Sequence, residues 1–176
     1  MTIDLEIVQA NSTHFEAIAD IWNPIIRDTL WTFNDKEKTV SDIENMISER
    51  DGLGFLNIVG IYEGKVIGFA SYTQFRSGTG YKKTMEHTVI IDPNARGIGA
   101  GRQLVGALER DARVKKVHSL IAGVSENNTV GLSFHKSIGF HEICVLPDVG
   151  FKFGKFLNLV LMQKKIVSWS LDIIWG

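Results

Sequence analysis

At 176 residues and 19.6 kDa, the chain has the length of one domain with a core of its own, since two domains would each be small. With 19 basic and 20 acidic side chains, its net charge of -1 excludes electrostatic attraction to nucleic acid or to an anionic membrane as the main basis of binding. The single cysteine excludes an intrachain disulfide and a cysteine-based zinc site, so we expect a reducing, cytoplasmic setting.

The first predicted elements are a strand and a helix. Residues 3–8 alternate loosely between apolar and polar side chains, as in a strand. Thr13 and Glu16 have the spacing of a capping box, and apolar residues then recur with helical period as far as Trp22. Pro24 is expected to end or kink this helix because proline lacks a backbone N–H.

A second helix and a hairpin follow. Ser41 and Glu44 form another capping-box pair, and the helix that they begin is expected to close at Gly52. Residues 55–62 and 65–74 are rich in β-branched and aromatic side chains on either side of Glu63-Gly64, which predicts a β-hairpin.

The remaining chain alternates between strands and helices. Further strands are expected at residues 84–92, 118–124, 140–146 and 156–163, and further helices at residues 99–113 and 129–137. The order β-α-α-β-β-β-α-β-α-β-β predicts an α/β (α+β) fold with a mixed, mostly antiparallel sheet of about seven strands and helices on both faces. The sequence has no linker, signal peptide or membrane-length apolar stretch, so we expect one domain over residues 1–176.

A glycine-rich junction between a strand and a helix carries the strongest local signal. The segment RGIGAGR at residues 96–102 leads directly into an amphipathic helix. Glycines let the backbone N–H groups approach a ligand, and the helix N-terminus and two arginines favour negative charge, so the segment suits a pyrophosphate. It fits neither the dinucleotide-binding nor the Walker pattern. A glycine-rich turn without any ligand is the alternative.

The segment matches R-x-x-G-x-G, and in this respect the sequence resembles the GNAT superfamily of acyl-CoA N-acyltransferases. Asn128 followed by FHKSIGF at residues 134–140 is similar to the downstream motif of that family, and the likeness covers residues 7–163. IWN at residues 21–23, FR at 75–76 and TMEHTV at 84–89 resemble the phosphinothricin and methionine sulfoximine acetyltransferase branch.

Three positions depart from that branch. Within the segment GFKFGKFLN at residues 150–158, Phe153, Phe156 and Asn158 stand where the branch has His, Trp and Asp. Apolar groups thus replace polar ones near the implied acceptor pocket, which puts a phosphinothricin-like substrate in doubt.

The resemblance implies acetyl-CoA as co-substrate and a set of residues that bind it. These residues are Val89, Ile90 and Ile91, whose backbone would pair with the pantetheine arm; Arg96, Gly97, Ile98, Gly99, Ala100, Gly101 and Arg102 at the pyrophosphate; and Asn128. Asn128 has the alternative role of a helix cap.

Two residues are candidates for the chemistry of acetyl transfer. The attacking amine must lose a proton, and the resemblance implies Glu86 as general base, acting through a water. His135 is a candidate proton donor to the leaving thiolate. Taken alone, Glu86 also fits an exposed strand carboxylate and His135 a structural histidine. The five histidines lack the spacing of metal ligands, and no metal is expected.

The acceptor is expected to be a small amino acid or analogue. Candidate substrate residues are Phe33, Phe75, Arg76, Tyr81 and Glu86, with Arg76 suited to a carboxylate; a solvated arginine and core aromatics are the alternative. A protein or peptide N-acetyltransferase and a non-catalytic acyl-CoA sensor are the rival functions. The resemblance also implies a homodimer. The apolar tail from Ile166 onward is expected to pack either against a partner subunit or against the core of its own chain.

Overall fold

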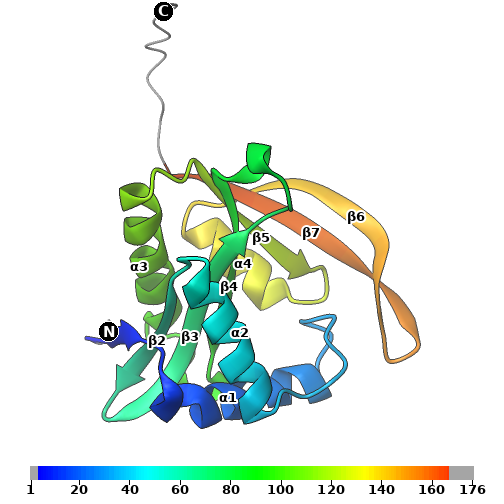
Figure 1. Ribbon diagram of the computed structural model, residues 1–176. Helices are drawn as coiled ribbons and strands as arrows, with labels where there is room; N and C mark the ends of the chain where they lie inside the picture. Colours follow the sequence, from blue (N-terminus) through cyan, green and yellow to red (C-terminus); the bar gives the residue numbers. More distant parts are fainter. Residues whose placement is uncertain (1–3, 167–176) are drawn as a thin grey trace, which may run out of the picture.

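Seven strands form one sheet in the computed structural model, which describes residues 4–166 (Figure 1). The strands are β1 (Glu6–Gln9), β2 (Asn57–Tyr62), β3 (Lys65–Gln74), β4 (Thr84–Ile91), β5 (Ser119–Ser125), β6 (His141–Lys152) and β7 (Lys155–Lys165). Their order across the sheet is β1-β2-β3-β4-β5-β7-β6, and every pair is antiparallel except β4 with β5. The predicted fold class is therefore confirmed.

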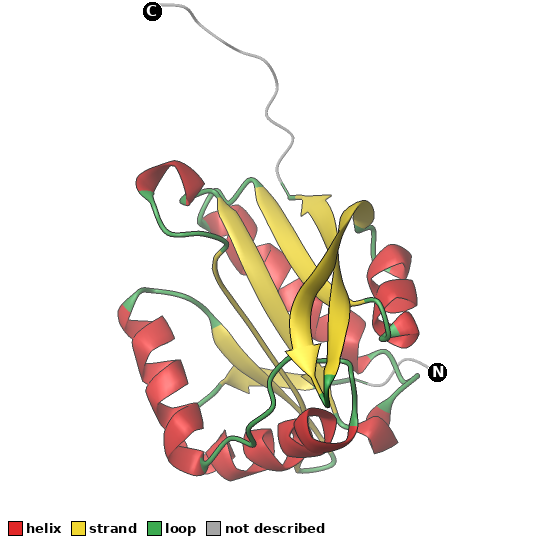
Figure 2. Cartoon of the chain, turned by 90° about the vertical axis from the view of Figure 1, so that its right-hand side faces the viewer, coloured by secondary structure: helices red, strands yellow, loops and turns green. Residues whose placement is uncertain are grey.

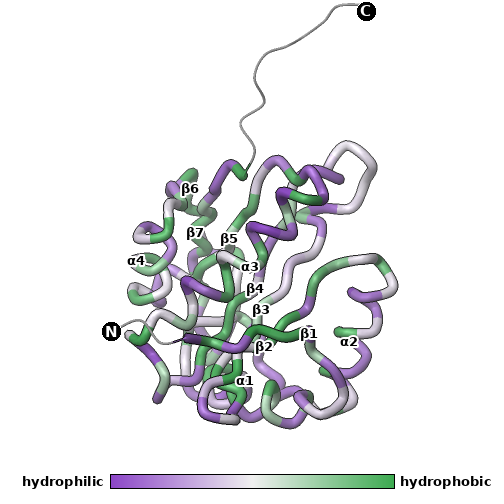
Figure 3. The backbone as a smooth tube through the Cα atoms, turned by 90° about the vertical axis from the view of Figure 1, so that its left-hand side faces the viewer, coloured by the Kyte–Doolittle hydropathy of each residue, from purple (hydrophilic) through white to green (hydrophobic). Residues whose placement is uncertain are grey.

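Two helices cover each face of the sheet (Figure 2). Helices α1 (Phe15–Asp28) and α2 (Val40–Gly52) pack with Val59 and Phe69 on one face, while α3 (Ala100–Val114) and α4 (Thr129–Ser137) pack on the other. Hydrophobic segments gather in the central strands between them (Figure 3). No helix within residues 4–166 is both long enough and apolar enough to cross a membrane.

Both predicted capping boxes are displaced toward the N-terminus. In the first, Asn11 accepts from Thr13 and pairs with His14 at the start of a short 3-10 turn, so the Thr13–Glu16 prediction was wrong. Asparagine is at least as good a cap as threonine, and it comes earlier in the chain.

The second helix begins with Thr39 rather than with Ser41. Thr39 and Asp42 bond reciprocally, with 3.1 Å from Asp42 N to Thr39 Oγ1 and 2.8 Å from Thr39 N to Asp42 Oδ2. Aspartate fills the place of the glutamate of the usual box because its shorter side chain reaches the same backbone N–H.

Helix α1 continues through Pro24 to Asp28, so of the two expected effects of Pro24, an end or a kink, the end is wrong. The turn after Pro24 buries Ile25 and Ile26, which are 7% and 0% exposed. Burial of two such side chains contributes about 3–6 kcal/mol, which is at least comparable with the roughly 3 kcal/mol that an internal proline costs.

Two tight turns close the hairpins of the sheet. Glu63 and Gly64, with φ of 49° and 75°, join β2 to β3 as predicted, and Phe153 and Gly154, with φ of 51° and 73°, join β6 to β7. Consecutive left-handed residues are the signature of the type I′ hairpin turn. The last two strands are longer than expected, because β6 extends to Lys152 and β7 runs from Lys155 to Lys165.

The loop between α1 and α2 is fastened to β6. Lys152, 2% exposed, donates from Nζ to the carbonyl oxygens of Thr29 at 2.8 Å and Thr32 at 3.0 Å. The ring of Phe33 lies so close to Gly150 that a Cβ there would come within 2.5 Å of it. This attachment brings the loop and the far end of the sheet together around the central strands.

Candidate functional site

Strands β4 and β5 pair over only three residues and then part. Their parallel register joins Thr84–Glu86 to Ser119–Ile121, and no pair follows within the described strands. A cavity of about 450 Å³ opens between the separated ends, lined by residues 87–91 of β4 and 122–124 of β5. Because β3 pairs with only one edge of β4, the other edge offers unpaired backbone groups to a ligand.

The glycine-rich loop lies at one end of this cavity. Gly97 and Gly99 adopt left-handed conformations, with φ of 81° and 88°, and Gly99 immediately precedes α3. Within residues 4–166, no group accepts a hydrogen bond from the backbone N–H of any residue from Arg96 to Arg102. A run of free donors at a helix N-terminus is a site for an anion, and the loop therefore fits a pyrophosphate.

Most of the expected cofactor residues line the cavity. They are Val89, Ile90, Ile91, Arg96, Gly99, Gly101, Arg102 and Asn128. Gly97 and Ile98 belong to the same loop but not to the lining, and neither does Ala100, the buried first residue of α3. Gly101 packs against Phe134, where a Cβ would lie 3.1 Å from the ring. The glycine thus lets α3 and α4 approach each other beside the cavity.

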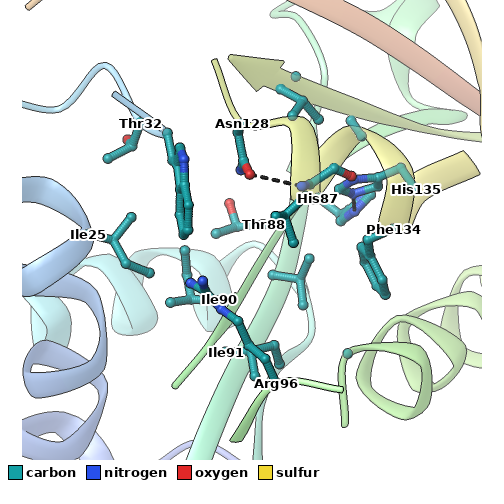
Figure 4. Close-up of a pocket in the computed structure, with 18 of the residues that line it drawn as sticks. Ile25, Thr32, His87, Thr88, Ile90, Ile91, Arg96, Asn128, Phe134 and His135 are labelled. Atoms are coloured by element: carbon teal, nitrogen blue, oxygen red, sulfur yellow. Dashed lines mark hydrogen bonds between the residues drawn. The ribbon is translucent and has the colours of Figure 1, made fainter. Parts of the chain in front are cut away.

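Asn128 begins helix α4. Its Oδ1 accepts from Gly131 N at 2.8 Å, so the capping role is confirmed (Figure 4). Its Nδ2 donates to no described group and remains on the cavity wall, where it can serve a ligand. Figure 4 shows Asn128, Phe134 and His135 facing Ile25 and Thr32 across the pocket, with Thr88, Ile90 and Ile91 between them.

His135 is buried and paired with a second histidine. Its Nε2 lies 3.0 Å from Nε2 of His87, and its Nδ1 lies 2.7 Å from the carbonyl oxygen of Gly131. A carbonyl only accepts, so Nδ1 of His135 carries the proton, and in the neutral pair His87 donates to His135 between the rings. Burial lowers both pKa values, that of His87 to about 3. No group of three His, Cys, Asp or Glu side chains within the described chain could hold a metal ion.

Glu86 lies on the opposite face of β4 from His87, as neighbouring strand residues must. It does not line the large cavity itself, but its Oε1 occupies the space that a Cβ at Gly123, a lining residue, would need, at 2.8 Å. Burial raises the pKa of the Glu86 carboxyl, and the positive charge of Arg76 opposes that shift. A carboxylate at the border of the cavity is therefore a stronger base than a solvated one.

The expected acceptor residues do not line the large cavity. Arg76 stacks on Phe75, with 5.2 Å from its guanidinium carbon to the ring centroid, and lines a second cavity. Tyr81 is 44% exposed in a short 3-10 turn, and Phe33 packs on β6.

The second cavity, of about 400 Å³, lies between α2 and the end of β3. Arg50 lines it beside Arg76 and Thr73, and Thr73 is the register partner of Glu86. Burial lowers the pKa of Arg50, whose Nη1 is buried without a hydrogen-bond partner. Among the described residues no carboxylate lies within 4.0 Å of this guanidinium. Glu49 also lines this cavity and its charge acts on Arg50, so the lining combines two guanidinium groups with one carboxylate and keeps an excess of positive charge for an anion.

Several lining residues were not found from the sequence. They come from α1 and the following loop and include Trp22, Ile25, Trp31, Thr32 and Asn34. No role was predicted for Trp31, although a tryptophan in a polar loop can indicate a binding site. Trp22 and Ile25 are placed by helix α1, whereas the loop residues Trp31, Thr32 and Asn34 lie in a segment that Lys152 and Gly150, more than 100 positions later, hold in place.

Comparison with known proteins points to one family. The profile described as the Acetyltransferase (GNAT) family matches residues 15–140. The chain is 32% identical over 157 residues to an L-methionine sulfoximine/L-methionine sulfone acetyltransferase from Salmonella typhimurium, covering 89% of this chain and 92% of that protein.

Solved structures agree with this assignment. Ribosomal-protein-alanine N-acetyltransferase from Brucella melitensis is 37% identical with a TM-score of 0.88, covering 92% of this chain and 99% of that one. YncA, a putative acetyltransferase from Salmonella typhimurium determined with its cofactor acetyl-CoA, is 31% identical with a TM-score of 0.88, covering 96% and 97%.

The histidine pair predicts acid sensitivity of the fold. In the unfolded chain both rings regain a pKa near 6.5, so between that value and the lowered folded pKa the unfolded state binds more protons. We expect the free energy of unfolding to fall as the pH is lowered from 7 to 5, with about 2 kcal/mol of the loss due to His87. Urea titrations at the two pH values measure it.

The quantity compared is the difference in the free energy of unfolding between pH 7 and pH 5. A variant that is less stable at both pH values can therefore still be tested. Replacing both His87 and His135 by Gln should reduce that difference, whereas His141→Gln, at an exposed position, should leave it unchanged. An undiminished difference in the double variant would mean that the pair is not the acid-sensitive element.

Proposed function

The chain belongs to the acetyltransferase (GNAT) family, and from this premise we propose that it transfers the acetyl group of acetyl-CoA to the amine of a small amino acid or amino-acid analogue. The observation that carries the proposal is the position of Glu86 between two cavities of different character. One side is bordered by Gly123 of the large cavity, and the other by Thr73 and Arg76 of the arginine-lined cavity.

In this proposal the large cavity holds the cofactor. The free N–H groups of residues 96–102, with Arg96 and Arg102, bind the pyrophosphate, and Asn128 donates from Nδ2 to the pantetheine arm. The unpaired edge of β4 at Val89, Ile90 and Ile91 pairs with the amide groups of that arm as an added strand would. A backbone N–H on the same edge stabilises the charge that develops on the thioester oxygen.

We assign Glu86 as the general base that removes a proton from the acceptor ammonium, through a water. Its raised pKa makes the carboxylate a better proton acceptor than an exposed glutamate. His135 stays our candidate proton donor to the leaving thiolate, but its one N–H is bonded to Gly131 and its Nε2 accepts from His87, so it donates only after one of these bonds is exchanged. Because its pKa is lowered, the ring is neutral at pH 7, which makes its contribution secondary to that of Glu86.

The acceptor is placed in the second cavity by its charge. An amino acid brings a carboxylate, and Arg50 and Arg76 supply guanidinium groups that lack an acidic partner within 4.0 Å. A protein N-terminus has no carboxylate next to its amine and would leave these arginines unused. This difference favours a free amino acid over a peptide acceptor, and a non-catalytic sensor would have no use for Glu86.

We also propose a cytoplasmic homodimer with one acyltransferase domain over residues 1–176. Exposed apolar side chains lie along β6, in the turn that follows it and at the start of β7: Ile143, Val145, Val149, Phe151, Phe153 and Phe156. Phe151 and Phe156 are register partners with ring centroids 5.1 Å apart. An apolar strip of this kind is suited to burial against a second copy. The reduced, exposed Cys144 is consistent with the cytoplasm.

Replacement of the base is the first test of this function. Thiol release from acetyl-CoA is followed with free amino acids, methionine sulfoximine and sulfone, phosphinothricin and short peptides. We expect turnover with a free amino acid or analogue, reduced at least tenfold in Glu86→Gln. In the wild type, kcat/KM should fall as the pH is lowered through the raised pKa of Glu86, and the variant should lack this limb. Turnover confined to peptides would contradict the proposed acceptor.

The second cavity predicts separate roles for its two arginines. Arg50→Met and Arg76→Met should each raise KM for the amino acid about tenfold or more, because each removes a charged hydrogen bond. Arg76→Met should also move the Glu86 limb to higher pH, since it removes the charge that lowers that pKa. Arg110→Met, at an exposed site on α3, is the matched control. Unchanged KM values in both variants would exclude this cavity as the acceptor site.

The apolar strip predicts the oligomeric state. The double substitution Phe151→Asp and Phe156→Asp should convert a dimer into a monomer, since two charges cannot be buried unpaired in an interface. Light scattering after gel filtration measures the mass, and Val114→Asp, at an 82% exposed position on α3, is the control. A wild type that is monomeric at every concentration, or a double variant that stays dimeric, would refute the assignment.

A further inference from the structure

A cation–π contact joins the two sides of the cofactor cavity. The guanidinium carbon of Arg96 lies 4.4 Å from the ring centroid of Trp31, and both residues line the cavity. Arg96 belongs to the glycine-rich loop before α3, and Trp31 to the loop between α1 and α2. Within residues 4–166 the Arg96 side chain makes no ion pair or hydrogen bond, so its interaction in this part of the chain is the contact with this ring.

Trp31 is held in place by its neighbours. Lys152 fixes the carbonyl groups on either side of it, those of Thr29 and Thr32, and Phe33 packs on the backbone of Gly150. No carboxylate lies within 4.0 Å of Lys152 among the described residues, so its hydrogen bonds go to this loop. Burying a lysine is costly unless its ammonium group is hydrogen-bonded, so these two bonds to carbonyl oxygens hold the loop in one conformation.

We propose that Trp31 is a positioning residue for Arg96 and thereby for the pyrophosphate of the cofactor. An indole attracts a guanidinium to its face, and the N–H groups in the plane of the guanidinium stay free to donate. An exposed arginine without such a support has many rotamers and loses that freedom on binding, which weakens the binding. Trp31 restricts the side chain before the ligand arrives and so reduces this loss.

This inference rests on the proposed use of residues 96–102 as the pyrophosphate site. The alternative explanation is that Trp31 contacts the thiol arm or the acceptor directly, as part of the cavity wall, and does not act through Arg96. The two differ in what happens with a shortened ligand. Pantetheine has the thiol arm of CoA but no pyrophosphate, so a residue acting through Arg96 matters for CoA and not for pantetheine.

Binding measurements separate these possibilities without requiring a known acceptor. Calorimetry with CoA and with pantetheine is carried out on the wild type, Trp31→Leu, Trp31→Phe, Arg96→Met and the Trp31→Leu/Arg96→Met double variant. We expect Trp31→Leu to weaken binding of CoA about tenfold, through loss of the cation–π contact, and binding of pantetheine less than twofold. Trp31→Phe should recover part of the loss, because it retains an aromatic face.

The double variant decides the mechanism. If Trp31 acts through Arg96, adding Trp31→Leu to Arg96→Met should weaken CoA no further. Full additivity, or equal weakening of CoA and pantetheine by Trp31→Leu, would overturn the inference. If Arg96→Met itself leaves CoA binding unchanged, the proposed pyrophosphate site is wrong, and that outcome is distinct from failure of the Trp31 role alone.

Discussion

The site depends on a single departure from regular pairing, the parting of β4 and β5 after three parallel pairs. Backbone N–H and C=O groups inside a protein need partners, and a central strand that lacks one on its free edge must take it from a ligand or from water. Here the free edge opens into the cavity of about 450 Å³, and the unbonded N–H groups of residues 96–102 lie at the end of the same strand. Strand edge and helix N-terminus together form one continuous row of donors and acceptors.

Side chains alternate between the two faces of β4, and this alternation places the candidate catalytic residues on opposite faces of the sheet. His87 and Val89 point to the face that α3 and α4 cover, while Glu86 and Ile90 point to the face of α1 and α2. The imidazole pair is therefore buried on one side of the strand, and the carboxylate lies on the side of the arginine-lined cavity. One strand thus separates the proposed base from the group proposed to assist the leaving thiolate, with both next to the same free edge.

Local patterns in the sequence were sufficient for the order of the strands, though not for the full length of β6 and β7, and for the hairpin at Glu63-Gly64 and the glycine-rich loop, because each depends on residues close together in the chain. They failed at α1, where burial of Ile25 and Ile26 outweighs the effect of Pro24. They also gave no indication of Trp31. Its position depends on Lys152, 121 residues further along the chain, and neither a periodicity nor a local motif predicts a contact between residues so far apart.

Burial and charge act on Glu86 in opposite directions, and this opposition bears on how the proposed base operates. Burial raises its pKa and so strengthens it as a proton acceptor, whereas Arg76 keeps the carboxyl ionised, as a base must be. In the proposed complex the acceptor carboxylate pairs with Arg76 and neutralises much of that positive charge. The same binding event also excludes water from the cavity, so both changes raise the pKa of Glu86. The acceptor ammonium opposes this shift, because a positive charge beside the carboxylate lowers its pKa. The base is therefore strengthened by neutralisation of Arg76 and loss of water, and this gain is largest once the ammonium has given up its proton.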